Sequence, residues 1–187
     1  MQSGFAAGKQ DQAFDFSSGI PRLRPLNLNT NGEISLENTK FVPRSNLEKK
    51  DYCERDELLF NNTNSAELVG KSAVFELDQP CVCSNHMTRL RVNDDVNAYY
   101  LEAILNLLRG VGYLGLLATK FNNQTGINSD TLKLLRVPVP PSDEQNRIAV
   151  AIQRRRDEAR RLCREAEKEW ETAKIRFEAE LLGDQCH

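Results

Sequence analysis

The sequence predicts an α+β fold in which a strand-rich domain is followed by one long C-terminal helix. Short apolar runs separated by turn residues fill residues 1 to about 140, a pattern typical of short strands. One apolar helix, residues 98–109, interrupts these runs and is expected to end at Gly110. Beyond Ser142 neither Gly nor Pro occurs until Gly183, which indicates one uninterrupted helix. We therefore expect a domain over residues 1–141 and a helical part over residues 142–187.

Six segments have the composition of strands. Turn residues such as Asn31-Gly32 and Asp78-Gln79-Pro80 fall between them and support this division. The expected strands are residues 22–28, 58–60, 73–77, 81–83, 88–92 and 134–139.

Composition places the chain among soluble proteins. It has 187 residues, of which 40% are hydrophobic and 28% charged. No apolar run approaches the roughly 20 residues of a membrane span, and the N-terminus lacks the apolar core of a signal peptide. The five cysteines are an odd number at scattered positions, which is not a disulfide framework. These features predict a cytoplasmic protein with no membrane partner.

The charge balance does not by itself indicate a nucleic acid partner. The formal net charge is −2. Residues 1–145 carry 15 Lys and Arg against 18 Asp and Glu, and residues 146–187 carry 10 against 9. Any surface that binds phosphates must therefore be a local patch.

The C-terminal helix has an apolar seam that needs a partner. Ser142 and Gln145 have the spacing of a capping box, and residues 143–182 would extend about 60 Å. The seam residues are three or four apart, except for one gap of seven where Arg155 or Arg156 interrupts, which is close to a heptad repeat. Since the chain offers a single helix of this kind, the partner helix must come from another chain. The expected interface residues are Ile148, Ile152, Ala159, Leu162, Ala166, Trp170, Ala173, Phe177 and Leu181.

Three polar segments rich in Asn stand out in the first part: residues 27–32, 61–65 and 122–126. The planar amide of Asn or Gln matches the N6/N7 edge of adenine, and hydroxyls reach phosphates or bases. Alternatively, Asn, Thr and Gly simply build turns, which is the better explanation for any single segment. Three such segments in one domain favour a polar recognition surface.

Basic residues lie near these segments in the sequence. They supply phosphate contacts if the fold makes them converge, and are otherwise ordinary surface charges. They are Arg22, Arg24, Lys71, Arg89, Arg91 and Lys120.

No catalytic motif or cofactor-binding motif is present. Cys81, Cys83 and His86 lack the second ligand pair of a structural zinc site, so Cys81 and Cys83 are expected to pack in the core. No P-loop or dinucleotide fingerprint occurs. The three arginines at 154–156 adjoin Asp157 and Glu158, which indicates a solvated or inter-helix face. We expect no metal and no cofactor.

The order of motifs resembles the specificity (S) subunits of type I restriction-modification systems. The matching stretches run over most of the chain. They are GIPRLRPLNL at 19–28, ELLFNNTNS at 57–65, LVGK at 68–71, QTGIN at 124–128, LK at 132–133, VPVPP at 137–141 and EQNRI at 144–148.

The resemblance implies a target recognition domain that reads one half of a bipartite DNA site. In this family a long helix follows each such domain, and two helices pair as an antiparallel coiled coil that sets the spacing between the half-sites. The subunit is not an enzyme, because methylation and cleavage come from separate M and R subunits that dock on it.

The sequence departs from the family pattern in three ways. It has one recognition domain and one helix instead of two of each, it lacks the short segment that commonly precedes Ser3-Gly4-Phe5, and Asp56-Glu57 stands where Gly-Asp is frequent. A half-size subunit is expected to homodimerise through its helix and so to read a palindromic bipartite site. The equal alternatives are that the chain is a fragment of a longer protein or the product of a split gene.

The resulting hypothesis is a DNA specificity subunit whose polar segments contact DNA. The alternatives are a coiled-coil protein whose globular head binds protein, and an enzyme built around His86 and the cysteines. The expected base or phosphate contacts are Asn61, Asn62, Thr63, Asn64, Ser65, Asn122, Asn123, Gln124 and Thr125. The expected phosphate contacts are Lys71, Arg22, Arg24 and Arg89.

Overall fold

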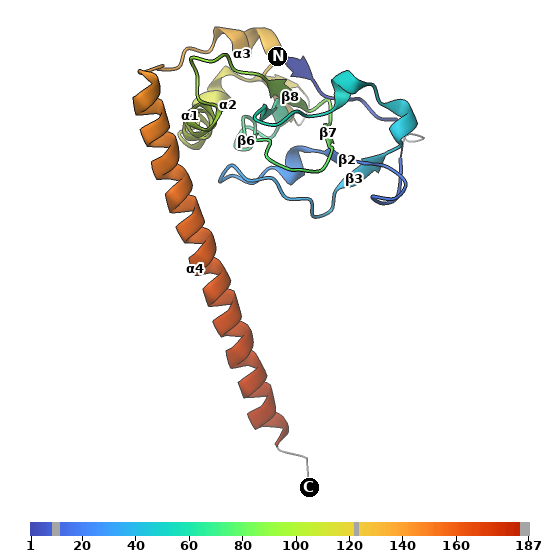
Figure 1. Ribbon diagram of the computed structural model, residues 1–187, viewed down its shortest axis with the longest axis vertical. Coiled ribbons are helices and arrows are strands. Elements are labelled where there is room, and N and C mark those ends of the chain that lie inside the picture. Colours follow the sequence, from blue (N-terminus) through green and yellow to red (C-terminus); the bar gives the residue numbers. More distant parts are fainter. Residues whose placement is uncertain (9–11, 122–123, 184–187) are drawn as a thin grey trace. The chain divides into compact units, whose positions relative to one another are not determined.

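The computed structural model describes residues 1–8, 12–121 and 124–183 of the chain (Figure 1). The chain divides into two compact units, residues 1–149 and 150–187. The first unit contains the strands, three shorter helices and the first turns of the long helix. The α+β class is confirmed, with strand-rich sheets and a long C-terminal helix. The first unit includes the first turns of the long helix and ends at Ala149, eight residues beyond the domain end expected at 141.

Within the described residues the strands form three sheets. The strand orders are β1-β8-β4-β6, β3-β2-β7 and β5-β10-β9. All pairs are antiparallel except β2 with β7. The bounds are β1 Gln2–Ser3, β2 Ile20–Leu23, β3 Lys40–Val42, β4 Leu58–Asn61, β5 Thr63–Asn64, β6 Ser72–Val74, β7 Val82–Cys83, β8 Met87–Leu90, β9 Thr119–Phe121 and β10 Gln124–Gly126.

Four α-helices follow or interrupt the strands. Asn97 caps the first of them by accepting hydrogen bonds from the N–H groups of Tyr99 and Tyr100, at 2.9 and 3.1 Å. The bounds are α1 Ala98–Gly110, α2 Tyr113–Leu117, α3 Ser129–Leu134 and α4 Ser142–Leu182, with short 3-10 turns at Pro25–Asn27, Arg44–Asn46 and Lys49–Asp51.

Strand β4 lies at the centre of the fold and is buried on both faces. Leu59 packs with Leu23 and Met87 in one core cluster. Leu58 and Phe60 belong to a second cluster that includes residues of α1, α2 and α3. Burial on both sides explains why the strand is a continuous apolar run and not an alternating one.

The expected core packing of Cys81 and Cys83 is confirmed, since both are fully buried and share a cluster with Cys53. Their mutual burial raises the pKa of the Cys81 thiol to about 12, because the charged form is poorly solvated there. Among the described residues no group of His, Cys, Asp and Glu could hold a metal ion. None of the described helices is long and apolar enough to cross a membrane.

The expected strand at 134–139 is wrong. Leu134 is the last residue of α3, and the following segment up to Pro141 pairs with no strand. The alternation of apolar residues with Arg136 and two prolines imitates a strand, but proline has no N–H to donate to a sheet.

The start of α4 also differs from the expected capping box. Gln145 is 1% exposed, and its side chain does not reach back along the helix towards the Ser142 N–H. Instead Nε2 donates to the carbonyls of Asp95 and Pro140, at 2.9 and 2.8 Å, and Oε1 accepts from the N–H of Asn97 at 2.9 Å. The amide thus fastens the first turn of α4 to the start of α1.

Candidate nucleic-acid interface

The polar segment 61–65 lies in the connection between the antiparallel strands β4 and β6, and part of it forms a strand of its own. Strand β4 ends at Asn61 and, after one residue, the chain continues as β5. Strand β5 pairs with β10, with Thr63 opposite Gly126 and Asn64 opposite Thr125. Strand β10 in turn pairs with β9. Two of the three polar segments, about 60 residues apart in sequence, therefore meet in one sheet, called here the small sheet (β5, β10 and β9).

The register of the small sheet separates its side chains onto two faces. Neighbouring residues on paired strands share a face, and successive residues on one strand alternate. Thr63, Gly126 and Thr119 are in register and occupy the first face. Asn64, Thr125 and Lys120 occupy the second, where Thr125 is buried. Only some of the expected contacts can therefore act on one ligand.

A groove with a volume of about 450 Å³ lies over the first face. Its lining is polar and uncharged, because it consists of hydroxyl and amide side chains, one glycine, one isoleucine and one aromatic ring. Such a lining offers hydrogen bonds to base edges or sugar and phosphate oxygens. The lining residues are Ser3, Asn62, Thr63, Thr88, Thr119, Phe121, Gly126, Ile127, Asn128 and Ser129.

Asn62 organises the groove from the junction between β4 and β5. Its Nδ2 donates to the Thr88 hydroxyl at 3.0 Å and to the Asn85 carbonyl at 3.2 Å, while its Oδ1 accepts from the Thr63 hydroxyl at 2.8 Å. The backbone of Asn62 also bonds to His86 and Ile127. Because its amide is occupied at both ends, Asn62 orients the neighbouring hydroxyls. The groove presents those hydroxyls to a ligand.

The positions of Asn61, Lys71 and Arg89 argue against the expected DNA contacts. Asn61 is 0% exposed, and its Nδ2 donates to the Leu68 carbonyl at 2.9 Å. Lys71 is buried, and its ammonium donates to the carbonyls of Pro25 and Leu28, at 2.7 and 2.6 Å. Desolvation, with repulsion from Arg109 second, lowers the pKa of Lys71. Buried side chains that already donate to carbonyls inside the fold are poorly placed to reach a phosphate.

Arg89, on β8, likewise donates its hydrogen bonds inside the fold. Its guanidinium donates to the carbonyls of Tyr52 and Lys50 and lies 3.4 Å from the Glu57 carboxylate, with both side chains buried. Removing one partner of such a pair leaves a buried charge uncompensated, which is strongly destabilising. Arg91 completes the cluster from the surface, at 3.1 Å from Glu57 and 2.7 Å from Glu54.

Arg22 and Arg24 are half-buried and hold loops. Arg22 donates to the Phe5 carbonyl, at 3.1 Å from Nη2, and to Asn85 Oδ1 at 3.4 Å. Burial, followed by repulsion from Arg24, lowers the pKa of Arg22. Arg24 donates to the Asn38 carbonyl at 2.7 Å. Arg22 thus bonds the side chain of Asn85, and the backbone carbonyl of Asn85 accepts from Asn62, so Asn85 links Arg22 to the groove residue Asn62.

The remaining expected residues fall into different places. Ser65 begins the turn after β5, where its carbonyl accepts from Leu68 and Val69. Gln124 is exposed on β10. Asn27, in the first polar segment, is fully buried and its Nδ2 donates to Ser35, Glu37 and Thr39, so that segment is a turn. Asn122 and Asn123 lie outside the described residues.

Sequence reasoning missed several groove residues. Thr88 comes from β8, Thr119 and Phe121 from β9, and Asn128 and Ser129 from the start of α3. Isolated threonines and serines carry no local signal. Only the pairing of β5 with β10 would have identified them.

The second unit is the exposed part of α4, and it separates its charges along its length. Residues 154–164 include six arginines against two acidic residues, whereas residues 165–180 include six glutamates against three basic residues. The apolar side chains of this part are exposed, among them Leu162, Trp170 and Phe177. A helix with this exposed apolar seam is expected to pack against another helix.

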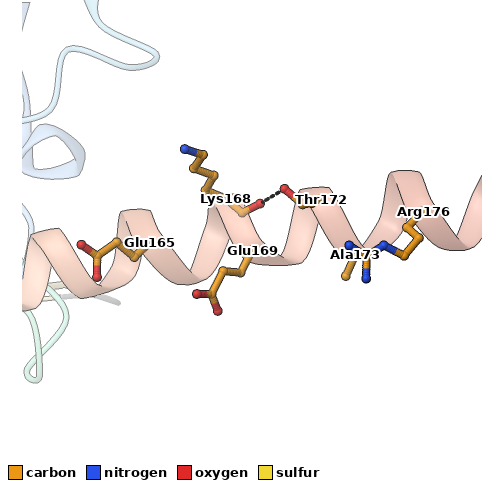
Figure 2. A pocket seen from close by; sticks show the side chains of 6 residues that line it. All are labelled: Glu165, Lys168, Glu169, Thr172, Ala173 and Arg176. Carbon is orange, nitrogen blue, oxygen red and sulfur yellow. Dashed lines mark hydrogen bonds between the residues drawn. The ribbon is translucent and has the colours of Figure 1, made fainter.

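A shallow depression on α4 has the geometry of coiled-coil packing (Figure 2). Its volume is about 430 Å³. Residues 165, 168, 169 and 172, and again 169, 172, 173 and 176, have the i, i+3, i+4, i+7 spacing of a hole that receives a side chain from a facing helix. The small side chains of Ala173 and Thr172 make this part of the helix surface shallow. The Thr172 hydroxyl donates to the Lys168 carbonyl at 2.8 Å.

A family model described as the type I restriction modification DNA specificity domain matches residues 7–160. The chain belongs to this family. A curated relative, the putative type I restriction enzyme MjaX specificity subunit of Methanocaldococcus jannaschii, is 33% identical over 138 residues. The match covers 70% of the present chain but 32% of that relative. The present chain therefore spans about a third of the relative's length.

Two solved structures share the fold. One is a chain from a study of complex assembly and conformational transition of the type I R-M system, and the two chains are 20% identical with a TM-score of 0.64. The match covers 92% of the present chain and 40% of that chain. The other is the HsdS subunit from Thermoanaerobacter tengcongensis, with a TM-score of 0.59, 18% identity, and coverage of 87% and 36%. At these identities the likeness establishes the fold.

Proposed function

We propose that this chain is the DNA sequence-recognition subunit of a type I restriction-modification complex, and that it reads one half of a bipartite site through the groove. The observation that carries the proposal is the pairing of β5 with β10, which gathers two polar segments over one uncharged groove. Uncharged hydroxyl and amide groups discriminate between base edges, whereas phosphate contacts do not. The subunit has no catalytic role of its own; methyltransferase and restriction subunits bind it and act on the DNA.

Selection from a random pool of duplex DNA, with the methyltransferase subunit present, tests this function. We expect one enriched half-site motif. A Thr63→Val variant, which removes one groove hydroxyl while keeping the side chain's shape, should change the preferred base at one position. Its matched control is Thr30→Val, an exposed threonine that does not line the groove. A pool without any enriched motif would instead support a head that binds protein.

We also propose that two copies pair through α4 in antiparallel orientation. The exposed seam requires a partner, and the charge separation favours this orientation, because the arginine-rich half of one helix then faces the glutamate-rich half of the other. Two recognition domains would result, one for each half of a palindromic site. Only Ala173 is common to this seam and to the depression on α4, so the second copy is expected to pack along the seam itself.

The dimer is tested by mass in solution. Leu162→Glu places a charge in the seam and should convert a two-chain mass into a one-chain mass. Ile175→Glu is the matched control, since this equally exposed residue lies on roughly the opposite side of the helix. Reversing the three arginines at 154–156 to glutamate should also weaken an antiparallel dimer. In a parallel dimer these residues face their own copies, and the reversal would leave the repulsion unchanged.

A further inference from the structure

One aromatic side chain, Phe121, lines the groove, where most of the other described lining residues carry hydroxyl or amide groups. It lies at the end of β9 and is 47% exposed. A half-exposed ring beside hydroxyl groups provides an apolar surface within a polar site. In ligand sites of mixed character, such surfaces recognise the apolar part of the ligand.

Gly126 leaves room for the ring of Phe121 because it has no side chain. A Cβ at Gly126 would lie 2.7 Å from Cε1 and 3.1 Å from Cζ of Phe121, closer than these atoms can pack. The ring therefore rests against the backbone of β10. Because Gly126 also lines the groove, any larger residue there would displace the ring from its position.

Gln124 is the cross-strand neighbour of Phe121. The two residues are directly opposite in the β9–β10 pairing and so occupy the same face of the small sheet. Gln124 is exposed, and its amide makes no hydrogen bond to any of the described residues. An apolar ring and an unused amide are thus presented side by side.

The chemistry of this pair matches one base pair better than the others. Among the described residues no Lys, Arg, Asp or Glu lines the groove, so this lining lacks the charged groups that bind guanine O6/N7 or cytosine N4. An apolar side chain contacts the C5-methyl group of thymine, and a Gln amide bonds adenine N6 and N7. We propose that Phe121 and Gln124 together read one A·T pair in the half-site, with the ring on the thymine methyl and the amide on adenine.

This inference rests on the proposed DNA-reading function and adds two specificity-determining residues with separate targets. The test uses duplexes carrying the half-site selected by the full-length chain with its methyltransferase subunit. Each thymine is replaced in turn by deoxyuridine, which lacks only the methyl group, and each adenine by 7-deazaadenine, which lacks only the N7 acceptor. Dissociation constants are measured for wild type, Phe121→Ala and Gln124→Ala.

We expect one thymine position at which deoxyuridine weakens wild-type binding about fourfold, the value for one buried methyl group. Phe121→Ala should abolish that sensitivity while preserving the loss at 7-deazaadenine. Gln124→Ala should show the reverse. Phe14→Ala is the matched control, because this phenylalanine is 94% exposed and does not line the groove. Gly126→Ala, checked for folding by circular dichroism, should lose the deoxyuridine effect although Phe121 is intact.

The outcomes separate the two levels of the argument. If no half-site is selected, the DNA-reading function fails and the inference with it. If a half-site is selected but contains no A·T pair, or if Phe121→Ala keeps full sensitivity to deoxyuridine at every position, the inference alone is overturned.

Discussion

Replacing Gln145 with alanine removes the amide that fastens the first turn of α4 to the first unit. The side chain is 1% exposed and makes three hydrogen bonds, at 2.8 to 2.9 Å. At about 1 kcal/mol for each bond, the loss is about 3 kcal/mol, and the N–H of Asn97 and the two carbonyls lose their partner as well. For a chain of this size 1 kcal/mol lowers the melting temperature by about 2–4 °C. We expect a decrease of about 6–12 °C.

Differential scanning calorimetry measures this effect, with Gln124→Ala as the matched control. The control removes the same side chain from an exposed position without a hydrogen-bond partner among the described residues, so its melting temperature should stay within about 2 °C of wild type. Equal shifts for the two variants would show that the Gln145 amide does not anchor the helix. A local effect confined to α4 would appear as early hydrogen exchange at its first turn.

Two further predictions concern residues whose role the fold reassigns. Lys71→Ala should lower the free energy of unfolding, measured by urea denaturation, because the buried Leu28 carbonyl loses its donor and the Pro25 carbonyl keeps only the 3.4 Å bond from the Leu28 N–H. Lys120→Ala, at an exposed position on the face of the small sheet away from the groove, is the control and should leave the free energy of unfolding unchanged in the same urea denaturation. Gly70→Ala should lower the free energy of unfolding by more than about 1 kcal/mol, because φ is +90° and the new Cβ would lie 2.3 Å from Leu114 Cδ1. The control is Gly110→Ala, where nothing lies within 4 Å of the new Cβ, and it should leave the free energy of unfolding unchanged in the same urea denaturation. Equal losses for the two variants would contradict the steric explanation.

The parts of the fold that local sequence determines were predictable. The apolar run of α1 with its following glycine, and the long helix without Gly or Pro, carry their boundaries in a few neighbouring residues. Strands β4, β6, β7 and β8 were also located, because their side chains are buried and most of them are apolar. In each case the signal and the structure span the same short stretch of chain.

The groove could be predicted only in part, because it depends on pairing between distant segments. The run 61–65 shows that Asn and Thr gather there, but not that Asn61 faces inward while Thr63 lines the groove. Alternation along one strand would place both on the same face, so the distinction arises because the chain leaves one sheet at Asn61 and enters another at Thr63. The same limit applies to Lys71, whose partners are carbonyls more than 40 residues away.

The single-residue junction between β4 and β5 has a consequence for how this protein can change. Strand β4 is fixed in register by the core, so the length of the junction decides which side chains of β5 reach the groove. Deleting Asn62 would bring Asn64 to the place of Thr63 and exchange a hydroxyl for an amide. An insertion or deletion of one codon would therefore change several groove side chains at once, whereas a substitution changes one.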